Sequence, residues 1–204
     1  MAGVVHVQLQ SEELLIQGDD LANVLTVEQL GLSPDGRGGL VITPDAKTAI
    51  NNLRAGTSLH LGPVHLTSVR IASGDGADDI SILGVSVAGG MQYENSGGFD
   101  SLRLADLDLD VEQDGRLDIV SASPLDVSIE HAAAVDMFLK IGDVKGESRS
   151  ARRVGHLRMA NSDLEGQLRV ESSASLDVSI SDSSAAAVDV FLKIPDIKGE
   201  SLRA

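Results

Sequence analysis

The sequence predicts an all-β protein, a β-solenoid built from stacked repeats. Three observations predict this class. Apolar residues alternate with polar ones along most of the chain, the resulting short strands are separated by Gly, Asp, Asn and Ser, and two long segments of the second half are nearly identical. The apolar residues are almost all Val, Ile, Leu and Ala, with 2% aromatic residues and no Trp, which suits a core of thin stacked layers.

Runs of alternating residues start at the N-terminus and recur along the chain. Val5, Val7 and Leu9 form the first run. The later runs are Ile80/Ile82, Val85/Val87, Leu102/Leu104, Leu107/Leu109/Val111, Leu117/Ile119, Leu125/Val127/Ile129, Leu168/Val170, Leu176/Val178/Ile180 and Val188/Val190/Leu192/Ile194. Residues 44–53 have apolar residues at helical spacing instead, and predict a short helix.

The second half of the chain repeats itself. GRLDIVSASPLDVSIE from Gly115 aligns with GQLRVESSASLDVSIS from Gly166, an offset of 51 residues (166 − 115 = 51). AAAVDMFLKIGDVKGES from Ala132 aligns with AAAVDVFLKIPDIKGES from Ala185, an offset of 53 (185 − 132 = 53). Each unit holds several strands, so it is predicted to cover two or more coils of about 20 residues. The two copies are predicted to stack in register in one sheet, with Val135, Met137, Leu139 and Ile141 matching Val188, Val190, Leu192 and Ile194.

The two repeat phenylalanines leave two phases open. Phe138 and Phe191 occupy equivalent places in the aligned copies, which suggests an aromatic ladder inside the coil. Simple alternation instead places Met137 and Leu139 inside and Phe138 outside.

The chain is predicted to divide at about Gly98 without losing continuity. An N-terminal part, residues 1–98, carries degenerate calcium-type loops, and residues 99–204 form the two-copy repeat part. No linker separates the two parts, so one continuous domain is expected.

The composition argues against several classes of function. The formal net charge of −15 argues against nucleic acid as a partner, since phosphate binding needs clustered Lys and Arg, and it suits cations or other proteins. The absence of Cys removes disulfides, thiolate zinc sites and Cys nucleophiles. No apolar run is long enough for a membrane span, and Met1–Gln10 shows no signal-peptide pattern.

A candidate calcium loop lies at residues 73–81, SGDGADDIS. It resembles the nonapeptide G-G-x-G-x-D-x-U-x of repeat-in-toxin proteins, in which glycines make the turn and Asp supplies an oxygen ligand. The predicted ligands are Asp78, with Asp75 and Asp79 in support and carbonyl groups at Gly74 and Gly76. A weaker copy, GDDLANVLT, begins 55 residues earlier (73 − 18 = 55). The alternative is an ordinary turn in which Asp side chains cap backbone amides.

Two resemblances add to this interpretation. LLIQGDDLANVLTVEQ (residues 14–29) and VRIASGDGADDISILGV (residues 69–85) resemble repeats of large exported bacterial β-helix proteins of the planctomycete type, with degenerate repeat-in-toxin motifs. That resemblance implies a right-handed parallel β-helix and a secreted or cell-surface location. AVDMFLKIGDVKGES (residues 134–148) and VDVFLKIPDIKGES (residues 188–201) resemble the N-terminal strand of the haemolysin-coregulated proteins, the tube subunits of type VI secretion. This second resemblance implies a barrel strand followed by a turn at residues 145–148 and 198–201.

The function expected from these features is non-enzymatic: a structural or adhesive β-solenoid segment of an exported or cell-surface assembly, with other protein chains or surface components as partners. No catalytic or cofactor-binding residue is predicted, and the oligomeric state is left open. A secretion-tube-related assembly component is the first alternative. The second is a carbohydrate-active β-helix enzyme, for which Asp106, Asp108 and Asp110 would supply carboxylates from one strand face.

Overall fold

The computed structural model describes residues 3–31, 33, 37–110, 115–142 and 154–192, and the regular elements in this part of the chain are all β-strands. They form a nine-stranded sheet, an eight-stranded sheet and a third sheet of four two-residue strands. In chain order the strands are β1 (Gly3–Gln10), β2 (Glu13–Gln17), β3 (Val24–Leu30), β4 (Gly38–Pro44), β5 (Thr48–Ile50), β6 (Leu59–Val64), β7 (Ser68–Ala72), β8 (Asp79–Leu83), β9 (Ser86–Val87), β10 (Met91–Asn95), β11 (Asp100–Ala105), β12 (Asp108–Leu109), β13 (Arg116–Ser121), β14 (Leu125–Glu130), β15 (Ala133–Ala134), β16 (Asp136–Ile141), β17 (Gly155–Ala160), β18 (Asp163–Leu164), β19 (Gln167–Ser172), β20 (Leu176–Ser181) and β21 (Ala187–Leu192).

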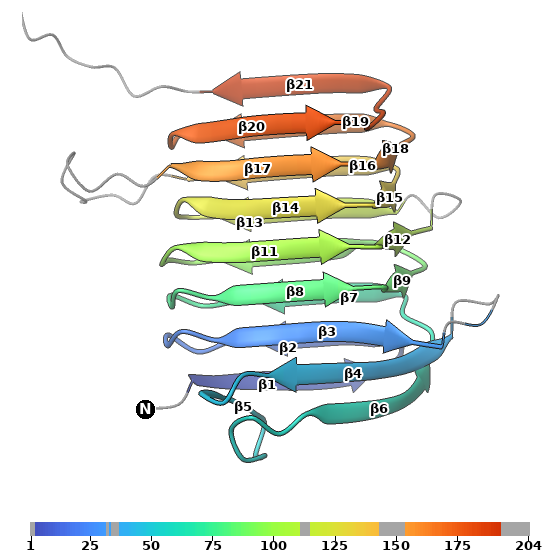
Figure 1. Cartoon of the computed structure of the whole chain (residues 1–204), viewed down its shortest axis with the longest axis vertical. Coiled ribbons are helices and arrows are strands. Elements are labelled where there is room, and N and C mark those ends of the chain that lie inside the picture. Colours follow the sequence, from blue (N-terminus) through green and yellow to red (C-terminus); the bar gives the residue numbers. More distant parts are fainter. Residues whose placement is uncertain (1–2, 32, 34–36, 111–114, 143–153, 193–204) are drawn as a thin grey trace, which may run out of the picture.

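In the described part of the chain, four coils take one strand from each of the three sheets. β7, β8 and β9 form one coil, and β10, β11 and β12 lie directly above them in parallel pairing. Followed upward in Figure 1, the chain crosses the front from left to right and returns behind, which is a right-handed coil. The predicted class, a parallel β-solenoid of stacked repeats, is confirmed.

The core follows from the alternation seen in the sequence. Because successive side chains of a strand point to opposite faces, every second residue faces the interior and stacks on its equivalent in the next coil. On the nine-stranded sheet one buried column consists of Ile16, Ile71, Tyr93, Ile119, Leu139 and Val170. On the eight-stranded sheet a second consists of Leu25, Ile80, Leu102, Val127 and Leu157. The interior is therefore a stack of apolar layers. Tyr93 is the only aromatic residue in these two columns.

The sequence repeats lie in equivalent coils, with one correction. Leu117 pairs with Met137, and Met137 pairs with Leu168, so one 51-residue unit (168 − 117 = 51) is two coils. β16 and β21 lie in the same sheet and run parallel, with β19 between them, as the stacking prediction requires. The residue matching is wrong by two positions, because Val188 lies in line with Met137 and not with Val135. A shift of two residues keeps every side chain on its own face, so the apolar pattern alone does not fix it.

The prediction of an aromatic ladder inside the coil is wrong. Met137 and Leu139 are buried, whereas Phe138 lies on the outer face and Phe191 is 56% exposed. The simple alternation gave the correct phase. Phe138 is also in line with Asp189 through Arg169, so the two rings are not at equivalent positions.

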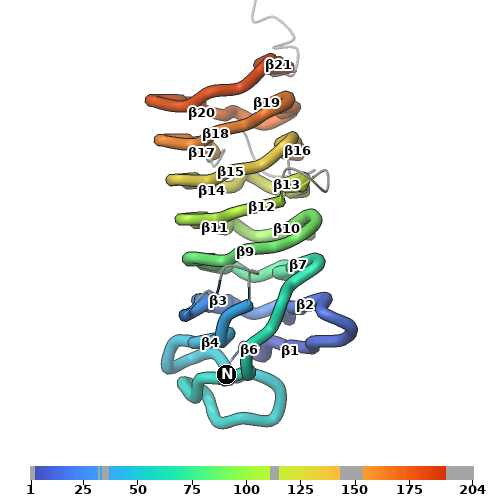
Figure 2. Tube along the Cα trace, turned by 90° about the vertical axis from the view of Figure 1, so that its right-hand side faces the viewer, coloured from blue at the N-terminus to red at the C-terminus, as the bar shows by residue number. Residues whose placement is uncertain are grey.

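Antiparallel strands close the N-terminal end of the column. β1 and β2 form a hairpin, and β4 runs antiparallel to both β3 and β6 (Figure 2). The predicted helix at residues 44–53 is wrong: β4 ends at Pro44, and β5 pairs with β1 so that Ile50 is fully buried. Residue 98, where the sequence suggests a division, lies in the turn between β10 and β11, and both large sheets run on across it.

Candidate functional site

Three turns lie directly above one another, between β2 and β3, β7 and β8, and β10 and β11. The Gly18 N–H donates to the Ala72 carbonyl at 2.8 Å, and the Ser73 N–H donates to the Glu94 carbonyl at 3.0 Å. The two calcium-type motif copies are thus consecutive coils, although 55 residues separate them, because β4, β5 and β6 are inserted between them. Gly98-Phe99-Asp100-Ser101-Leu102 is a third copy of the same spacing, which the sequence analysis missed.

Glycine is required where the turn backbones meet. A Cβ atom on Gly98, which has a φ of 82°, would overlap the Gly76 carbonyl oxygen. A Cβ atom on Gly76 would likewise overlap the Leu21 carbonyl. The Gly-x-Asp spacing therefore has a structural cause in this chain: the close approach of stacked turns.

A ladder of buried polar side chains ties these turns together. The Asp78 Oδ1 atom accepts the Asn23 N–H at 2.7 Å, and the Asp100 Oδ1 atom accepts the Asp78 N–H at 3.0 Å. The second oxygen of Asp100 accepts hydrogen bonds from the Tyr93 hydroxyl at 2.7 Å and the Ser73 hydroxyl at 2.9 Å. All five side chains are buried. Each carboxylate thus binds the coil below it through a backbone amide.

Burial dominates the electrostatics of this ladder. Desolvation raises the pKa of Asp78 to about 7, with a smaller contribution from the neighbouring Asp100, while the Asn23 N–H acts in the opposite direction. Desolvation also raises the pKa of Asp100 and that of the Tyr93 hydroxyl. The Asp78 Oδ2 and Asn23 Oδ1 atoms have no hydrogen-bond partner. These groups are enclosed within the column, where their hydrogen bonds to neighbouring coils offset part of the cost of burying them.

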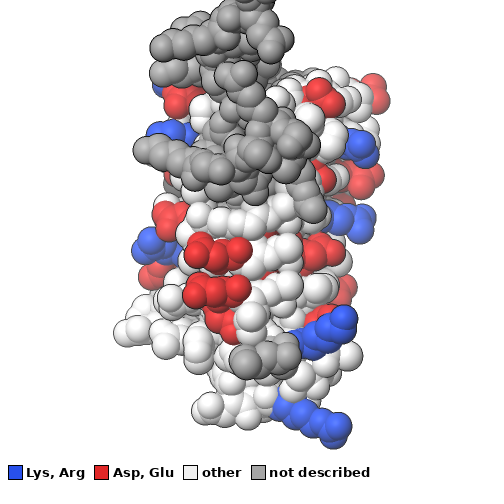
Figure 3. All heavy atoms as spheres, turned by 90° about the vertical axis from the view of Figure 1, so that its left-hand side faces the viewer, with Lys and Arg blue, Asp and Glu red and all other residues white. Residues whose placement is uncertain are grey.

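The predicted calcium ligands occupy different surroundings. Asp75 is exposed in the turn, Asp79 is exposed on β8, and only Asp78 is buried. The Gly74 carbonyl already accepts the N–H groups of Ser96 and Gly97, both at 3.3 Å. In the described ranges, no three His, Asp or Glu side chains come together as metal ligands. Acidic side chains do gather near the middle of the face that carries these turns (Figure 3). Calcium binding stays a prediction. The Asp78 carboxylate accepts a hydrogen bond from a backbone amide, which is what the alternative, an ordinary turn, predicts.

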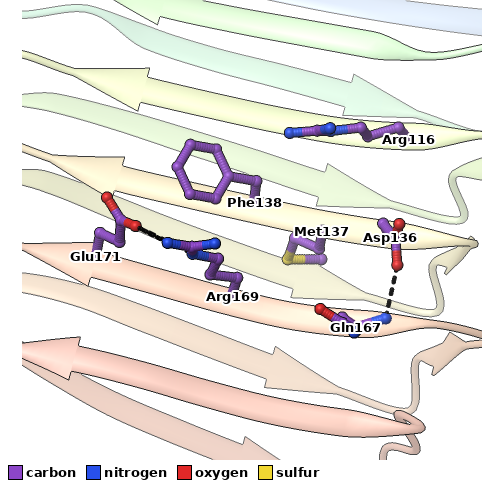
Figure 4. A pocket seen from close by; sticks show the side chains of 7 residues that line it. All are labelled: Arg116, Asp136, Met137, Phe138, Gln167, Arg169 and Glu171. Atoms are coloured by element: carbon purple, nitrogen blue, oxygen red, sulfur yellow. Dashed lines mark hydrogen bonds and ion pairs between the residues drawn. The ribbon is translucent and has the colours of Figure 1, made fainter.

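A second candidate site lies on the outer face of the nine-stranded sheet. The guanidinium groups of Arg116 and Arg169 each lie 5.8 Å from the centroid of the Phe138 ring, and Arg169 lies 5.6 Å from that of Phe191. We call these four residues the Arg–Phe ladder. Figure 4 shows Arg116, Phe138 and Arg169 on three successive strands.

Three residues of the ladder, Arg116, Phe138 and Arg169, border an open groove of about 330 Å³. Asp136, Met137, Gln167 and Glu171 complete its lining. Ion pairs fix both cations: Arg116 Nε lies 2.6 Å from Asp118 Oδ1, and Arg169 Nη2 lies 2.5 Å from Glu171 Oε1. The ladder thus presents rings and cations held in place on an acidic molecule. This ladder was not predicted from the sequence. The available signal was that alternation places Phe138 on the outer face and that the strands on either side each carry an Arg.

A smaller groove of about 230 Å³ lies on the eight-stranded sheet. The His156 Nδ1 atom lies 2.6 Å from Asp126 Oδ1, and its Nε2 atom lies 3.8 Å from Asp177 Oδ2. Both ring nitrogens therefore face carboxylates, which suits an ion-paired surface histidine better than a base that activates a hydroxyl.

The other residues singled out from the sequence are placed as follows. Asp106 and Asp108 are exposed, the first in the turn after β11 and the second in β12, and Asp110 follows β12. The prediction that these three carboxylates lie on one strand face is therefore wrong, because the chain turns at Asp106, where φ is 52°. The strands that resemble the secretion-tube motif, β16 and β21, are parallel strands of the nine-stranded sheet. The turns expected at residues 145–148 and 198–201 lie outside the described residues.

No protein-family model, curated protein or solved structure matches this chain. Within the described ranges, no helix has the length and apolar character needed to cross a membrane.

Proposed function

We propose that this chain is a non-enzymatic, structural or adhesive segment of an exported or cell-surface assembly, with other protein chains or surface components as partners. The Arg–Phe ladder is the observation that carries the proposal. Arg and aromatic side chains contribute most to binding at protein surfaces, and here they are held in place before contact by flanking carboxylates and a sheet.

The buried polar ladder supports the structural part of the proposal. A catalytic acid or base must reach its substrate, and its pKa is usually shifted within an open site. The groups with raised pKa values, Asp78, Asp100 and Tyr93, are instead 0–2% exposed and bind neighbouring coils. Their arrangement suits a rigid column that presents its outer faces.

Retention on immobilised neutral and acidic polysaccharides tests the proposal. The folded chain should be retained without releasing soluble sugar, and Phe138→Ala together with Arg169→Ala should weaken retention at least tenfold. Arg70→Ala is the matched control, because Arg70 is exposed on the same face but outside the ladder. Release of oligosaccharides would overturn the non-enzymatic proposal and favour the carbohydrate-active alternative.

Electron microscopy distinguishes the proposed adhesive segment from the alternative, a secretion-tube component. A tube component assembles into closed rings, whose heterologous interfaces repeat around an axis. Rings of this chain would favour that alternative over a column-shaped adhesive segment.

Calcium binding at the stacked turns has narrower support within this proposal. The Asp78 Oδ2 atom is buried and lacks a partner, and hard cations prefer carboxylate oxygens. If calcium binds there, millimolar calcium should raise the melting temperature of the wild type and leave that of Asp78→Asn unchanged. An identical melt with calcium and with a chelator would leave the loop as an ordinary turn.

A further inference from the structure

The last described coil carries an uncovered apolar surface. β20 and β21 are each paired on one side only. Their inward-phase residues are exposed: Val178 37%, Ile180 40%, Val188 51% and Val190 42%. Their register partners one coil below, Leu157, Met159, Leu168 and Val170, are 0–2% exposed. The exposure therefore comes from the absence of a covering layer among the described residues and not from a change of phase.

The other end of the column is closed. The antiparallel strands β4 and β6 and the β1–β2 hairpin cover it, and Leu40, Ile42 and Ile50 are fully buried there. The two ends thus differ in kind. Unpaired strand edges with apolar side chains are templates for pairing with another chain.

We propose that two copies of this chain associate end to end through β20 and β21, as a closed two-fold pair. A two-fold axis across the column sets equivalent edge strands antiparallel, so that N–H groups of one copy face carbonyl groups of the other. At the capped end the edge strands β5 and β6 leave Leu40, Ile42 and Ile50 fully buried. That end therefore has no exposed apolar layer comparable to that of β20 and β21, so the pair closes and does not extend into a filament. The proposal goes beyond the adhesive function and does not depend on it.

The charges on these strands suit self-pairing. Pairing centred on Ser179 sets Val178 opposite Ile180 of the second copy and Asp177 opposite Ser181, so no carboxylate faces another on β20. Pairing centred on Val190 sets Asp189 opposite Phe191 of the second copy. That ring lies 5.6 Å from the Arg169 guanidinium, which places each Asp189 near a cation.

The end face is small, so the pair should be reversible. A six-residue strand is about 20 Å long and facing sheets lie about 10 Å apart. An interface of this size falls in the weak class, below about 1,200 Å² in total. The population of pairs should therefore depend on protein concentration.

Sedimentation and light scattering of the full chain between about 1 and 500 µM test the proposal. The mass should rise from 21.3 kDa toward twice that value and no further. Val190→Lys should weaken association at least tenfold, because it sets a charge against the apolar surface of the partner. Leu53→Lys is the matched control: Leu53 is 38% exposed at the capped end, and this variant should associate like the wild type. Thermal melts of both variants confirm folding.

Hydrogen exchange identifies the surface used. The amides of β20 and β21 should gain protection as the concentration rises, and those of β6 should not. A monomer at every concentration would overturn the proposal, and protected β20 and β21 amides in that monomer would assign the cover to residues 193–204. Species larger than two copies, or a pair that survives Val190→Lys, would also overturn it.

Discussion

Phe138 and Leu139 are neighbours in β16 but face opposite sides of the sheet. Leu139 is fully buried, so Leu139→Ala should destabilise the protein by about 2–5 kcal/mol through lost apolar contact and a cavity. Phe138→Ala removes an outward ring between two guanidinium groups and should cost only about 1–2 kcal/mol. Urea denaturation of both variants measures the difference, and equal losses would show that the phase of β16 is wrong.

Asp78 should make stability depend on pH. Its pKa is about 7 in the folded state, against an ordinary value of 3.8. Between these two values the folded state holds a proton that the unfolded state has released, so the free energy of unfolding should fall as the pH rises through this window and level off above it. At about 1.4 kcal/mol per pH unit, the loss is at most about 4 kcal/mol.

Denaturation in chelator at pH 5, 6, 7 and 8 measures this dependence. Asp78→Asn cannot ionise and should make the curve less steep, leaving the dependence that comes from Asp100. Asp75→Asn, in the same turn but exposed, should retain the wild-type slope. An unchanged slope in Asp78→Asn would contradict the assignment.

At the residue scale, the sequence predicts which side chains face inward but not the polar ladder. The period of two places Ile80, Leu102 and Leu139 correctly because alternation alone decides their face. Asp100 and Tyr93 escaped prediction because their partners are 7–27 residues away and are set by the stacking of coils. The Gly-x-Asp spacing at Gly98 was the available signal.

At the element scale, the turns that follow β8, β11, β14, β17 and β20 of the eight-stranded sheet each contain one residue in the left-handed backbone conformation. These residues and their φ values are Gly84 (59°), Asp106 (52°), His131 (52°), Asn161 (50°) and Asp182 (47°). The Asp106 N–H donates to the Glu130 carbonyl at 3.0 Å, and the same bond recurs along the column. One backbone conformation is thus repeated in each coil. Glycine, Asn and Asp tolerate it best.

Gly84 offers a direct test of this column. A Cβ atom there would meet only the Gln29 carbonyl oxygen, at 3.6 Å, so space is not limiting. Gly84→Asn should change stability by less than about 1 kcal/mol, whereas Gly84→Val should cost more than about 1–2 kcal/mol from backbone strain. Thermal melts compare the two, and an equal cost would indicate crowding in place of strain.

The strands β4, β5 and β6, which we call the cap because they close the N-terminal end, are the elements that the sequence predicted least well. Residues 44–53 look helical because a ten-residue segment has too few turns to separate a period of 3.6 from chance spacing. Burial of Ile50 against β1 decided the outcome, and that contact joins residues 45 positions apart (50 − 5 = 45). The 55-residue gap between two stacked motif copies has the same cause: the cap is inserted between successive coils.

At the scale of the whole molecule, the repeats predicted the column well. Near-identity at an offset of 51 residues predicted a unit of two or more coils, and the structure shows two coils stacked in parallel. The 53-residue offset of the second segment misled the residue matching, because both offsets leave apolar residues on the inner face. The Arg–Phe ladder depends on register between strands, which the alternation does not specify.

Distances along the column test the solenoid most directly. Arg70, Gln92, Asp118, Phe138, Arg169 and Asp189 form one outward column, one residue per coil. Stacked parallel strands lie about 4.8 Å apart, so spacing should depend on the number of coils and not on the number of residues between them.

Double electron–electron resonance between spin labels on two introduced cysteines measures this spacing. The natural chain has no Cys, so only the introduced residues carry labels. Arg70→Cys with Arg169→Cys spans four coils and should give about 19 Å, and Arg70→Cys with Asp189→Cys should give about 24 Å. The predicted result is an increase of about 5 Å per coil, whatever the length of the intervening loop. A shorter distance for the second pair, or two distances that differ by tens of ångströms, would contradict a continuous parallel solenoid.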